Sequence, residues 1–142
     1  MKDYINIILN LAKKAYKNGD IPVGAIIVKN NKIISKAYNK KEKNNVATHH
    51  AEILAIQKAC KKLKTWHLDD CILYTTLEPC IMCAGAIAQS RIKKIVYMAE
   101  NEKFGFTNYF NNGKISNHNI LIEKIDDSLS KNLLVQFFKD KR

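Results

Sequence analysis

The sequence predicts an α/β protein, a sandwich in which helices cover both faces of a mixed β-sheet. Strand-like apolar runs alternate with segments of helical periodicity along the chain. The run at 71–76 is apolar throughout, as in strands buried on both faces, and a helical segment and another strand-like run follow it. With 142 residues, 46% of them hydrophobic, the chain is expected to form one domain over residues 1–142.

The first half of the chain is expected to hold a helix, a β-hairpin and a second helix. Apolar side chains recur at helical spacing as far as Tyr16, and Gly19 is expected to end this amphipathic helix. Two β-branched runs separated only by Asn30 and Asn31 predict a hairpin. The expected elements are a helix over 3–18, strands over 23–28 and 32–38, a solvated loop over 39–45 and a helix over 49–62.

The second half continues the alternation of strands and helices. Pro79 suits the first position of a helix, so the segment EPCIMCAGAIAQS is expected to turn into one. If that helix is a crossover, the strands before and after it are parallel. The expected elements are strands over 71–76, 93–99 and 119–125, a helix within 78–90 and a terminal helix over 128–141.

No export or membrane segment is predicted. Asp3, Asn6 and Asn10 interrupt the N-terminal apolar segment, and no small-residue cleavage site follows it. No apolar run approaches the roughly 18 residues that a membrane span needs. We therefore expect a cytoplasmic protein with no membrane partner, whose four cysteines are reduced.

The chain carries a net charge of +11, with 24 Lys and Arg against 13 Asp and Glu. Such an excess favours a polyanionic partner, nucleic acid first. However, 22 of the 24 basic residues are lysines, and Lys, Asn and Ile all have AT-rich codons. Biased codon usage is therefore an equally good explanation of the charge.

Cys80 and Cys83 form a Cys-x-x-Cys pair at the expected start of a helix. Both thiols then lie on one face of the first turn, where free N–H groups and the helix dipole favour thiolates. The spacing indicates a metal site, with a redox pair as the alternative. Tetrahedral zinc needs one or two more ligands. The candidates are His49, His50, His67, His118, Cys60 and Cys71, although the two cysteines are better explained as small buried hydrophobic residues.

The segment ATHHAEILAI places His50 and Glu52 at the head of the second long helix. At a helix N-terminus both side chains can reach over the tip, because the preceding turn is absent. His50 would then meet the two thiols across a pocket. Three protein ligands leave zinc an open position for water, the catalytic arrangement, and Glu52 would move protons without binding the metal. For His-x-Glu alone, a surface pair is the simpler explanation.

Together these motifs, His50-Ala51-Glu52 and Pro79-Cys80-Ile81-Met82-Cys83, match the zinc nucleobase deaminase signature. The segments IPVGAIIV, AYN, HAEILAI, LYTTLEPCIMCAGA, SRIKKIVY, Asn117-His118 and FFKDKR resemble, in order, the bacterial tRNA-specific adenosine deaminases. The resemblance covers nearly the whole chain. It implies a three-layer α/β/α sandwich of the cytidine-deaminase type with a five-stranded mixed sheet. It also implies a homodimer that converts the wobble adenosine of a tRNA anticodon stem-loop to inosine.

The resemblance assigns a role to each matching residue. It implies one Zn²⁺ per chain, held by His50, Cys80 and Cys83, with Glu52 as the proton shuttle. Asn39 would hold the target nucleotide, Ile21 and Pro22 would line the base pocket, and Ala51 would supply a backbone amide. Lys103, Arg91 and the tail 139–142 are the candidates for contacts with RNA phosphates.

The chain departs from the family around the substrate and not at the zinc motifs. Residues 46–49 are Val-Ala-Thr-His where many members have Asp-Pro-Thr-Ala, and ENEKFGFTNYFNN replaces a Gly-rich run. Asn101 stands where an aspartate is usual, at the rim of the expected pocket, as a candidate contact to the sugar-phosphate backbone. The alternative function is a guanine deaminase, followed by a cytidine-type deaminase. A zinc-stapled RNA-binding module would need a fourth protein ligand.

Overall fold

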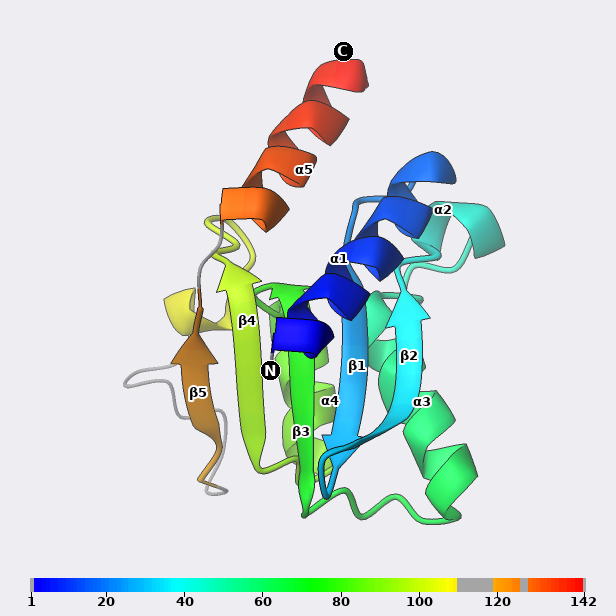
Figure 1. Ribbon diagram of the computed structural model, residues 1–142, viewed down its shortest axis with the longest axis vertical. Helices are drawn as coiled ribbons and strands as arrows, with labels where there is room; N and C mark the ends of the chain where they lie inside the picture. Colours follow the sequence, from blue (N-terminus) through cyan, green and yellow to red (C-terminus); the bar gives the residue numbers. More distant parts are fainter. Residues whose placement is uncertain (1, 110–118, 126–127, 142) are drawn as a thin grey trace.

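The computed structural model describes residues 2–109, 119–125 and 128–141 (Figure 1). Five strands form one sheet in the order β2-β1-β3-β4-β5. The strands are β1 (Gly24–Lys29), β2 (Lys32–Tyr38), β3 (Cys71–Leu77), β4 (Lys94–Ala99) and β5 (Leu121–Lys124). The helices are α1 (Lys2–Lys17), α2 (Lys41–Asn44), α3 (Ala51–Leu63), α4 (Ile81–Gln89) and α5 (Ser128–Asp140), with a 3-10 turn, η1 (Phe106–Asn108).

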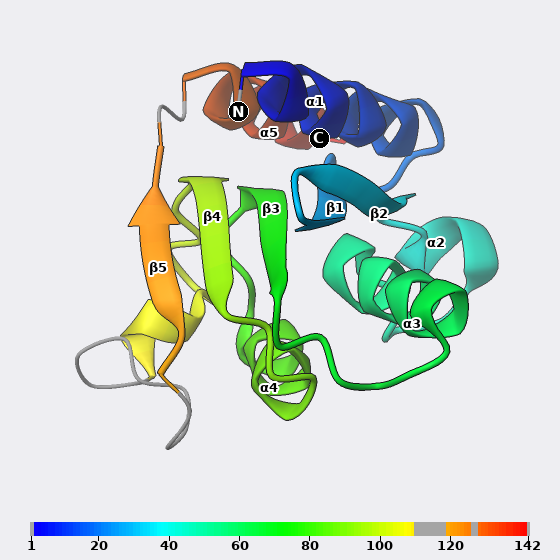
Figure 2. The same ribbon diagram turned by 60° about the horizontal axis from the view of Figure 1, so that its bottom comes forward.

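The sheet lies between two layers of helices, with α1 and α5 on one side and α3 and α4 on the other (Figure 2). β1 is antiparallel to both β2 and β3, whereas β3, β4 and β5 are mutually parallel. The expected α/β/α sandwich with a five-stranded mixed sheet is confirmed, and so is the crossover through α4. Among the described residues, no helix is both long and apolar enough to span a bilayer.

The hairpin between β1 and β2 follows from its two asparagines. Asn30 and Asn31 have φ values of 51° and 62°, and Lys29 pairs directly with Lys32. Two consecutive residues with positive φ characterise the tight turn that matches the twist of the flanking strands, and asparagine tolerates this conformation.

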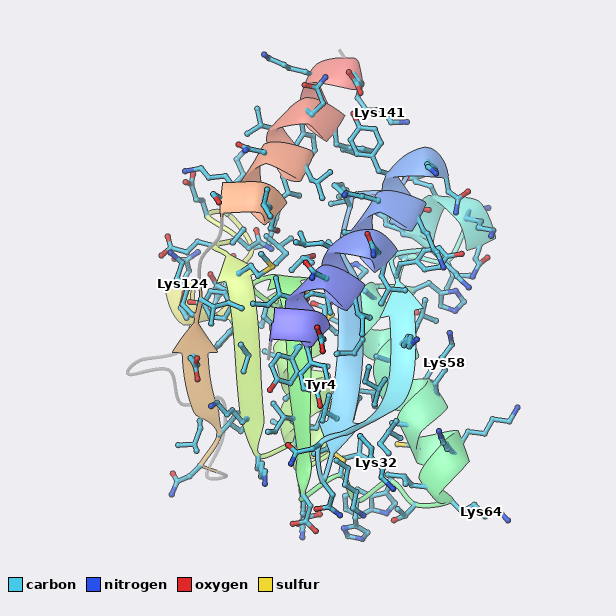
Figure 3. All side chains as sticks on the ribbon, in the orientation of Figure 1. Tyr4, Lys32, Lys58, Lys64, Lys124 and Lys141 are labelled. Carbon is cyan, nitrogen blue, oxygen red and sulfur yellow. The ribbon has the colours of Figure 1, made fainter. Side chains whose placement is uncertain are left out.

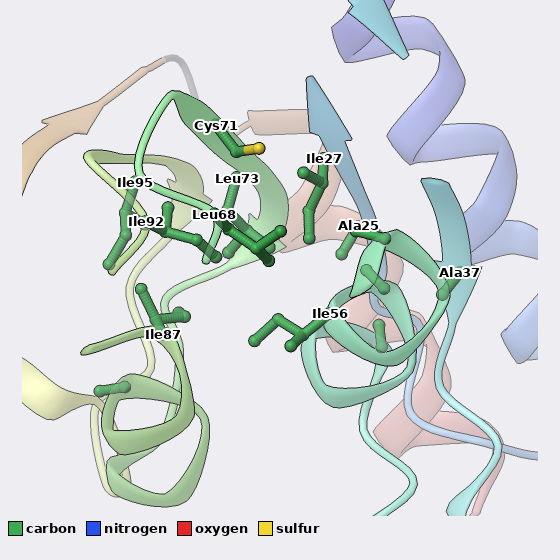
Figure 4. Close-up of a cluster of buried hydrophobic side chains, with 14 of the residues drawn as sticks. Ala25, Ile27, Ala37, Ile56, Leu68, Cys71, Leu73, Ile87, Ile92 and Ile95 are labelled. Carbon is green, nitrogen blue, oxygen red and sulfur yellow. The ribbon is translucent and has the colours of Figure 1, made fainter. Parts of the chain in front are cut away.

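Both faces of the central strands are buried because each strand alternates between two hydrophobic cores. In β1, Ala25 and Ile27 point to the side of α3 and α4, and Ile26 and Val28 point to the side of α1. Figure 4 shows the first core, in which Ile27 and Leu73 from the sheet face Ile56 and Ile87 from the helices. This core also holds Cys71, with the partly buried Cys60 packed against it, so both cysteines are small apolar side chains, as expected.

Two local expectations differ from the structure. The expected loop at 39–45 contains the short helix α2, whose amides at Glu42 and Lys43 donate to the carboxylate of the buried Asp20 over 2.6 and 3.1 Å. The first N–H groups of a helix have no partner within the helix, and the Asp20 carboxylate accepts from two of them and so stabilises α2. In addition, α4 begins at Ile81 with Cys80 as its N-cap, so Pro79 precedes the helix and does not occupy its first position.

Candidate functional site

Two helix N-termini bring three ligand side chains together. His50 is the N-cap residue of α3, Cys80 is the N-cap residue of α4, and Cys83 lies in the first turn of α4. His50 Nδ1 lies 3.7 Å from Cys80 Sγ and 3.5 Å from Cys83 Sγ. The structure therefore forms the His/Cys/Cys cluster that the motifs predict.

The two N-cap residues keep their side chains available because neither caps its own helix. Ser, Thr, Asp or Asn usually occupies this position and accepts a hydrogen bond from the first turn. His50 and Cys80 have extended backbone conformations, with ψ of 152° and 174°, and neither makes a side-chain capping bond. Their side chains instead approach each other across the gap between α3 and α4.

Hydrogen bonds within the cluster shift the pKa values of its three side chains. A hydrogen bond from Cys83 is the main cause that lowers the pKa of Cys80 to about 4. The same bond, together with burial, raises the pKa of Cys83, and the bond to Cys80 raises the pKa of His50. Metal ligation requires deprotonated thiols and a neutral imidazole, and the lowered pKa of Cys80 favours the thiolate form.

Glu52 is a buried carboxyl group next to the cluster. It lies in the first turn of α3, and only 4% of its surface is exposed. Burial raises its pKa to about 7, and the negative charge of the Cys80 thiolate adds to this effect. A carboxyl group with a pKa close to the operating pH can both accept and release a proton, which is what general acid–base catalysis requires.

The cluster fits a metal ion with an open coordination position. The three ligand atoms lie within 4.8 Å of one another, and within the described part of the chain this is the one group of three or more His, Cys, Asp or Glu so arranged. His49 is engaged with Asn44 at 2.9 Å, and His67 stacks on Trp66. His118 lies outside the described residues. A zinc-stapled module would need a fourth protein ligand, and among the described residues none joins the cluster.

A cavity of about 330 Å³ opens beside the cluster. Its lining includes His50, Glu52 and Cys80, and also Lys41, Leu77, Glu78, Ile81, Phe104 and Tyr109. Of the residues expected to contact the substrate, Ile21, Asn39, Ala51 and Asn101 line this cavity. Pro22, also expected there, is buried in the segment between α1 and β1 and is not a lining residue, whereas its neighbour Val23 is.

Comparison with known proteins identifies the family. A family model described as MafB19-like deaminase matches residues 1–142, the whole sequence. The tRNA-specific adenosine deaminase of Aquifex aeolicus (strain VF5) is 44% identical over 142 residues, covering 98% of this chain and 94% of that protein. The chain belongs to the tRNA-specific adenosine deaminase family. A second member, from Rickettsia bellii (strain RML369-C), is 50% identical over 99 residues, 68% of each chain.

Solved structures of this family and of a neighbouring one share the fold. A tRNA:A34 deaminase structure superposes with a TM-score of 0.87 at 31% identity, covering 94% of this chain and 100% of that one. A guanine deaminase from Bacillus subtilis gives a TM-score of 0.68 at 33% identity, covering 98% and 93%. The family resemblance predicted from the motifs is confirmed, and the guanine deaminases share its architecture.

The basic residues expected to contact RNA lie on separate parts of the chain. Lys103 is exposed on the loop next to the lining residue Phe104. Arg91 follows the far end of α4, about 13 Å from its N-terminus at 1.5 Å per residue, and its guanidinium lies over Trp66 at 5.6 Å. Of the tail, Arg142 lies outside the described residues. Figure 3 shows two other lysines far from each other, Lys58 on α3 and Lys141 just after α5.

Sequence reasoning did not identify Glu78, a second buried carboxylate of the cavity. Its side chain is 2% exposed and accepts hydrogen bonds from the Asn101 amide at 3.2 Å and from the amide and hydroxyl of Thr107 at 3.0 and 2.7 Å. Glu78 therefore fixes the loop after β4 against the cavity. The available signal was a charged residue directly after an otherwise buried strand and before Pro79.

Proposed function

We propose that this protein is a zinc-dependent hydrolase that converts adenosine to inosine at the wobble position of a tRNA anticodon. The observation that carries the proposal is the buried Glu52 carboxyl beside a three-ligand cluster, in a cavity that has room for a purine base. The sulfur and imidazole donors suit zinc and do not suit magnesium or calcium. The substrate is the one printed in the names of the relatives.

His50, Cys80 and Cys83 would hold the zinc ion. When bound in such a site, zinc lowers the pKa of a water molecule to about 7 and thereby supplies the nucleophile for C6 of adenine. Glu52 would accept one proton from the water molecule and deliver it to the ring nitrogen next to C6. It would then accept the second proton from the new hydroxyl group on C6 and deliver it to the amino group, which leaves as ammonia. Its pKa of about 7 suits each of these transfers.

Asn39 and Ala51 would orient the nucleotide. Asn39 is 5% exposed, and its amide is fixed between the Ile21 carbonyl at 3.3 Å and the Lys41 amide at 3.4 Å. Ala51 is the first residue of α3, where a backbone N–H has no partner within the helix. Both residues line the cavity, so a fixed amide and a free donor face the space where the base would lie.

A homodimer in the cytoplasm, where tRNA is found, is part of the proposal. The outer side of α4 supports the dimer, because Ile81 is 50% exposed and no atom lies within 4 Å of a Cβ built on Gly85. An exposed apolar helix face with a glycine allows close approach of a second helix. Sedimentation of the holoenzyme tests this: a monomer at micromolar concentration contradicts it.

Guanine deamination is the second candidate, because a guanine deaminase is 33% identical and shares the fold. Ammonia release from an anticodon stem-loop, free guanine and free cytidine, measured with one preparation, separates the candidates. We expect turnover of the stem-loop, with inosine as the product. Turnover of guanine without turnover of the stem-loop would overturn the proposed function.

A further inference from the structure

The loop after β4 places two exposed aromatic side chains at the mouth of the cavity. Phe104 and Tyr109 are 63% and 55% exposed, and both line the cavity that contains the His/Cys/Cys cluster and Glu52. Large apolar side chains exposed together next to a functional cavity indicate a contact surface for a ligand.

The loop that carries these rings is anchored to the protein core. The Glu78 carboxylate accepts three hydrogen bonds from Asn101 and Thr107, at the two sides of Phe104. Phe106, between the two rings in sequence, is fully buried, and its amide donates to the Pro79 carbonyl at 2.9 Å. The exposed rings are therefore held in place by a buried carboxylate and a buried aromatic anchor.

Gly105 allows this close packing. A Cβ at this position would overlap the Glu78 carboxylate and would lie 2.5 Å from the Asn101 carbonyl oxygen. Consequently the backbone at position 105 can lie this close to Glu78 only because glycine has no side chain. In the sequence Phe104-Gly105-Phe106, the first ring is exposed and the second is buried. The glycine between them lets the backbone pack against Glu78.

The bases on either side of the target stay connected to it through the backbone. When the target base lies in the cavity beside Glu52, its neighbours in the strand lie near the rim, where Phe104 and Tyr109 are exposed. Unpaired bases stack on exposed aromatic rings, whatever their sequence. Lys41 lines the same cavity as the two rings, and the exposed Lys103 precedes Phe104 in sequence, so both lysines are candidates for contacts with the neighbouring phosphates.

We propose that Phe104 and Tyr109 form a stacking platform for the bases that flank the target adenosine. The platform makes the enzyme select a single-stranded polynucleotide loop over a free nucleoside or base. This inference rests on the proposed function and adds to it the residues that recognise the context of the target.

The test replaces each ring with an aliphatic side chain. For Phe104→Leu and Tyr109→Leu, we expect the KM for an anticodon stem-loop to rise about five- to hundredfold, as for the loss of a base–aromatic stack, with kcat changed less than about threefold. Phe104→Tyr and Tyr109→Phe keep the ring and should resemble the wild type. The matched control is Trp66→Leu, a 54% exposed aromatic residue that stacks on His67 outside the cavity lining.

A second substrate identifies the bases involved. In stem-loops with abasic residues on both sides of the target, the KM difference between wild type and the two leucine variants should disappear. An undiminished difference there, or an unchanged KM on the normal stem-loop, overturns the platform and leaves the proposed function intact. A wild-type enzyme that deaminates guanine but not the stem-loop overturns both. Metal content and thermal midpoint confirm that each variant is folded.

Discussion

Replacing Glu52 with glutamine separates proton transfer from metal binding. Glutamine has nearly the same shape, so it can occupy a site that is 4% exposed, but it has no proton to exchange. Burial raises the pKa of the wild-type carboxyl to about 7, so this group can exchange a proton near neutral pH. We expect the variant to keep one metal ion per chain, because Glu52 is not in the three-ligand cluster.

The loss of activity follows from the value of positioned proton transfer. General acid–base catalysis contributes about 10²–10⁴-fold, so kcat for Glu52→Gln should fall by this factor, equivalent to about 2.7–5.4 kcal/mol in the barrier. Single-turnover formation of inosine at saturating enzyme measures the chemical step. Metal content of the same sample, determined by mass spectrometry, gives the second readout.

Glu102→Gln is the matched control for this experiment. It makes the same chemical change at an exposed position on the loop next to the cavity, and its single-turnover rate should stay within about twofold of wild type. If Glu52→Gln loses its metal, Glu52 is a ligand. If its rate stays near that of wild type, another group moves the proton. Either result refutes the role assigned to Glu52.

Three further predictions concern the metal, the packing of α1 and the charge. His50→Ala should lose both metal and activity, and metal retained at one ion per chain would contradict the ligand assignment. Gly24→Ala should lower the free energy of unfolding by about 1–3 kcal/mol, because its Cβ would overlap the Ile8 carbonyl oxygen of α1. Chemical denaturation of the variant and the wild type measures this difference, and an unchanged free energy would contradict the close packing. Titration of a labelled stem-loop at several salt concentrations should show a steep fall of affinity with salt, because lysines that contact phosphates displace counterions. If the affinity does not depend on salt, biased codon usage is the better explanation of the +11 charge.

The elements and the metal site could be predicted because their signals are local. The strand β1 alternates between two cores and contains a run of β-branched residues, which identifies a buried strand without knowledge of its partners. The ligands are visible because His50, Cys80 and Cys83 lie at helix heads, where side chains can face outward from the tip. That the N-termini of α3 and α4 lie close together is a tertiary property that no local pattern encodes. The sequence indicates it only through the need of zinc for a third ligand besides the two cysteines.

The contacts that shape the cavity could not be predicted because they join distant segments through side chain to backbone bonds. Asp20 accepts from amides 22 and 23 positions later, and Glu78 accepts from the amide of Thr107, 29 positions later. No periodicity marks such a residue, since a single buried carboxylate with backbone donors resembles a surface acid in the sequence. For the same reason α2 was expected to be a loop: its first turn depends on Asp20, which lies outside it.

Asn101 shows why a match to a family position does not by itself define a role. Its Oδ1 accepts a hydrogen bond from the Phe104 amide at 3.2 Å, so the side chain holds the turn that presents the exposed ring. An aspartate could accept the same bond, so the turn needs a hydrogen-bond acceptor at position 101 and asparagine supplies one without a charge. The Asn101 backbone amide separately donates to the buried Glu78 carboxylate, a contact that does not depend on the side chain. The place of Asn101 in the turn is therefore separable from any contact with the substrate.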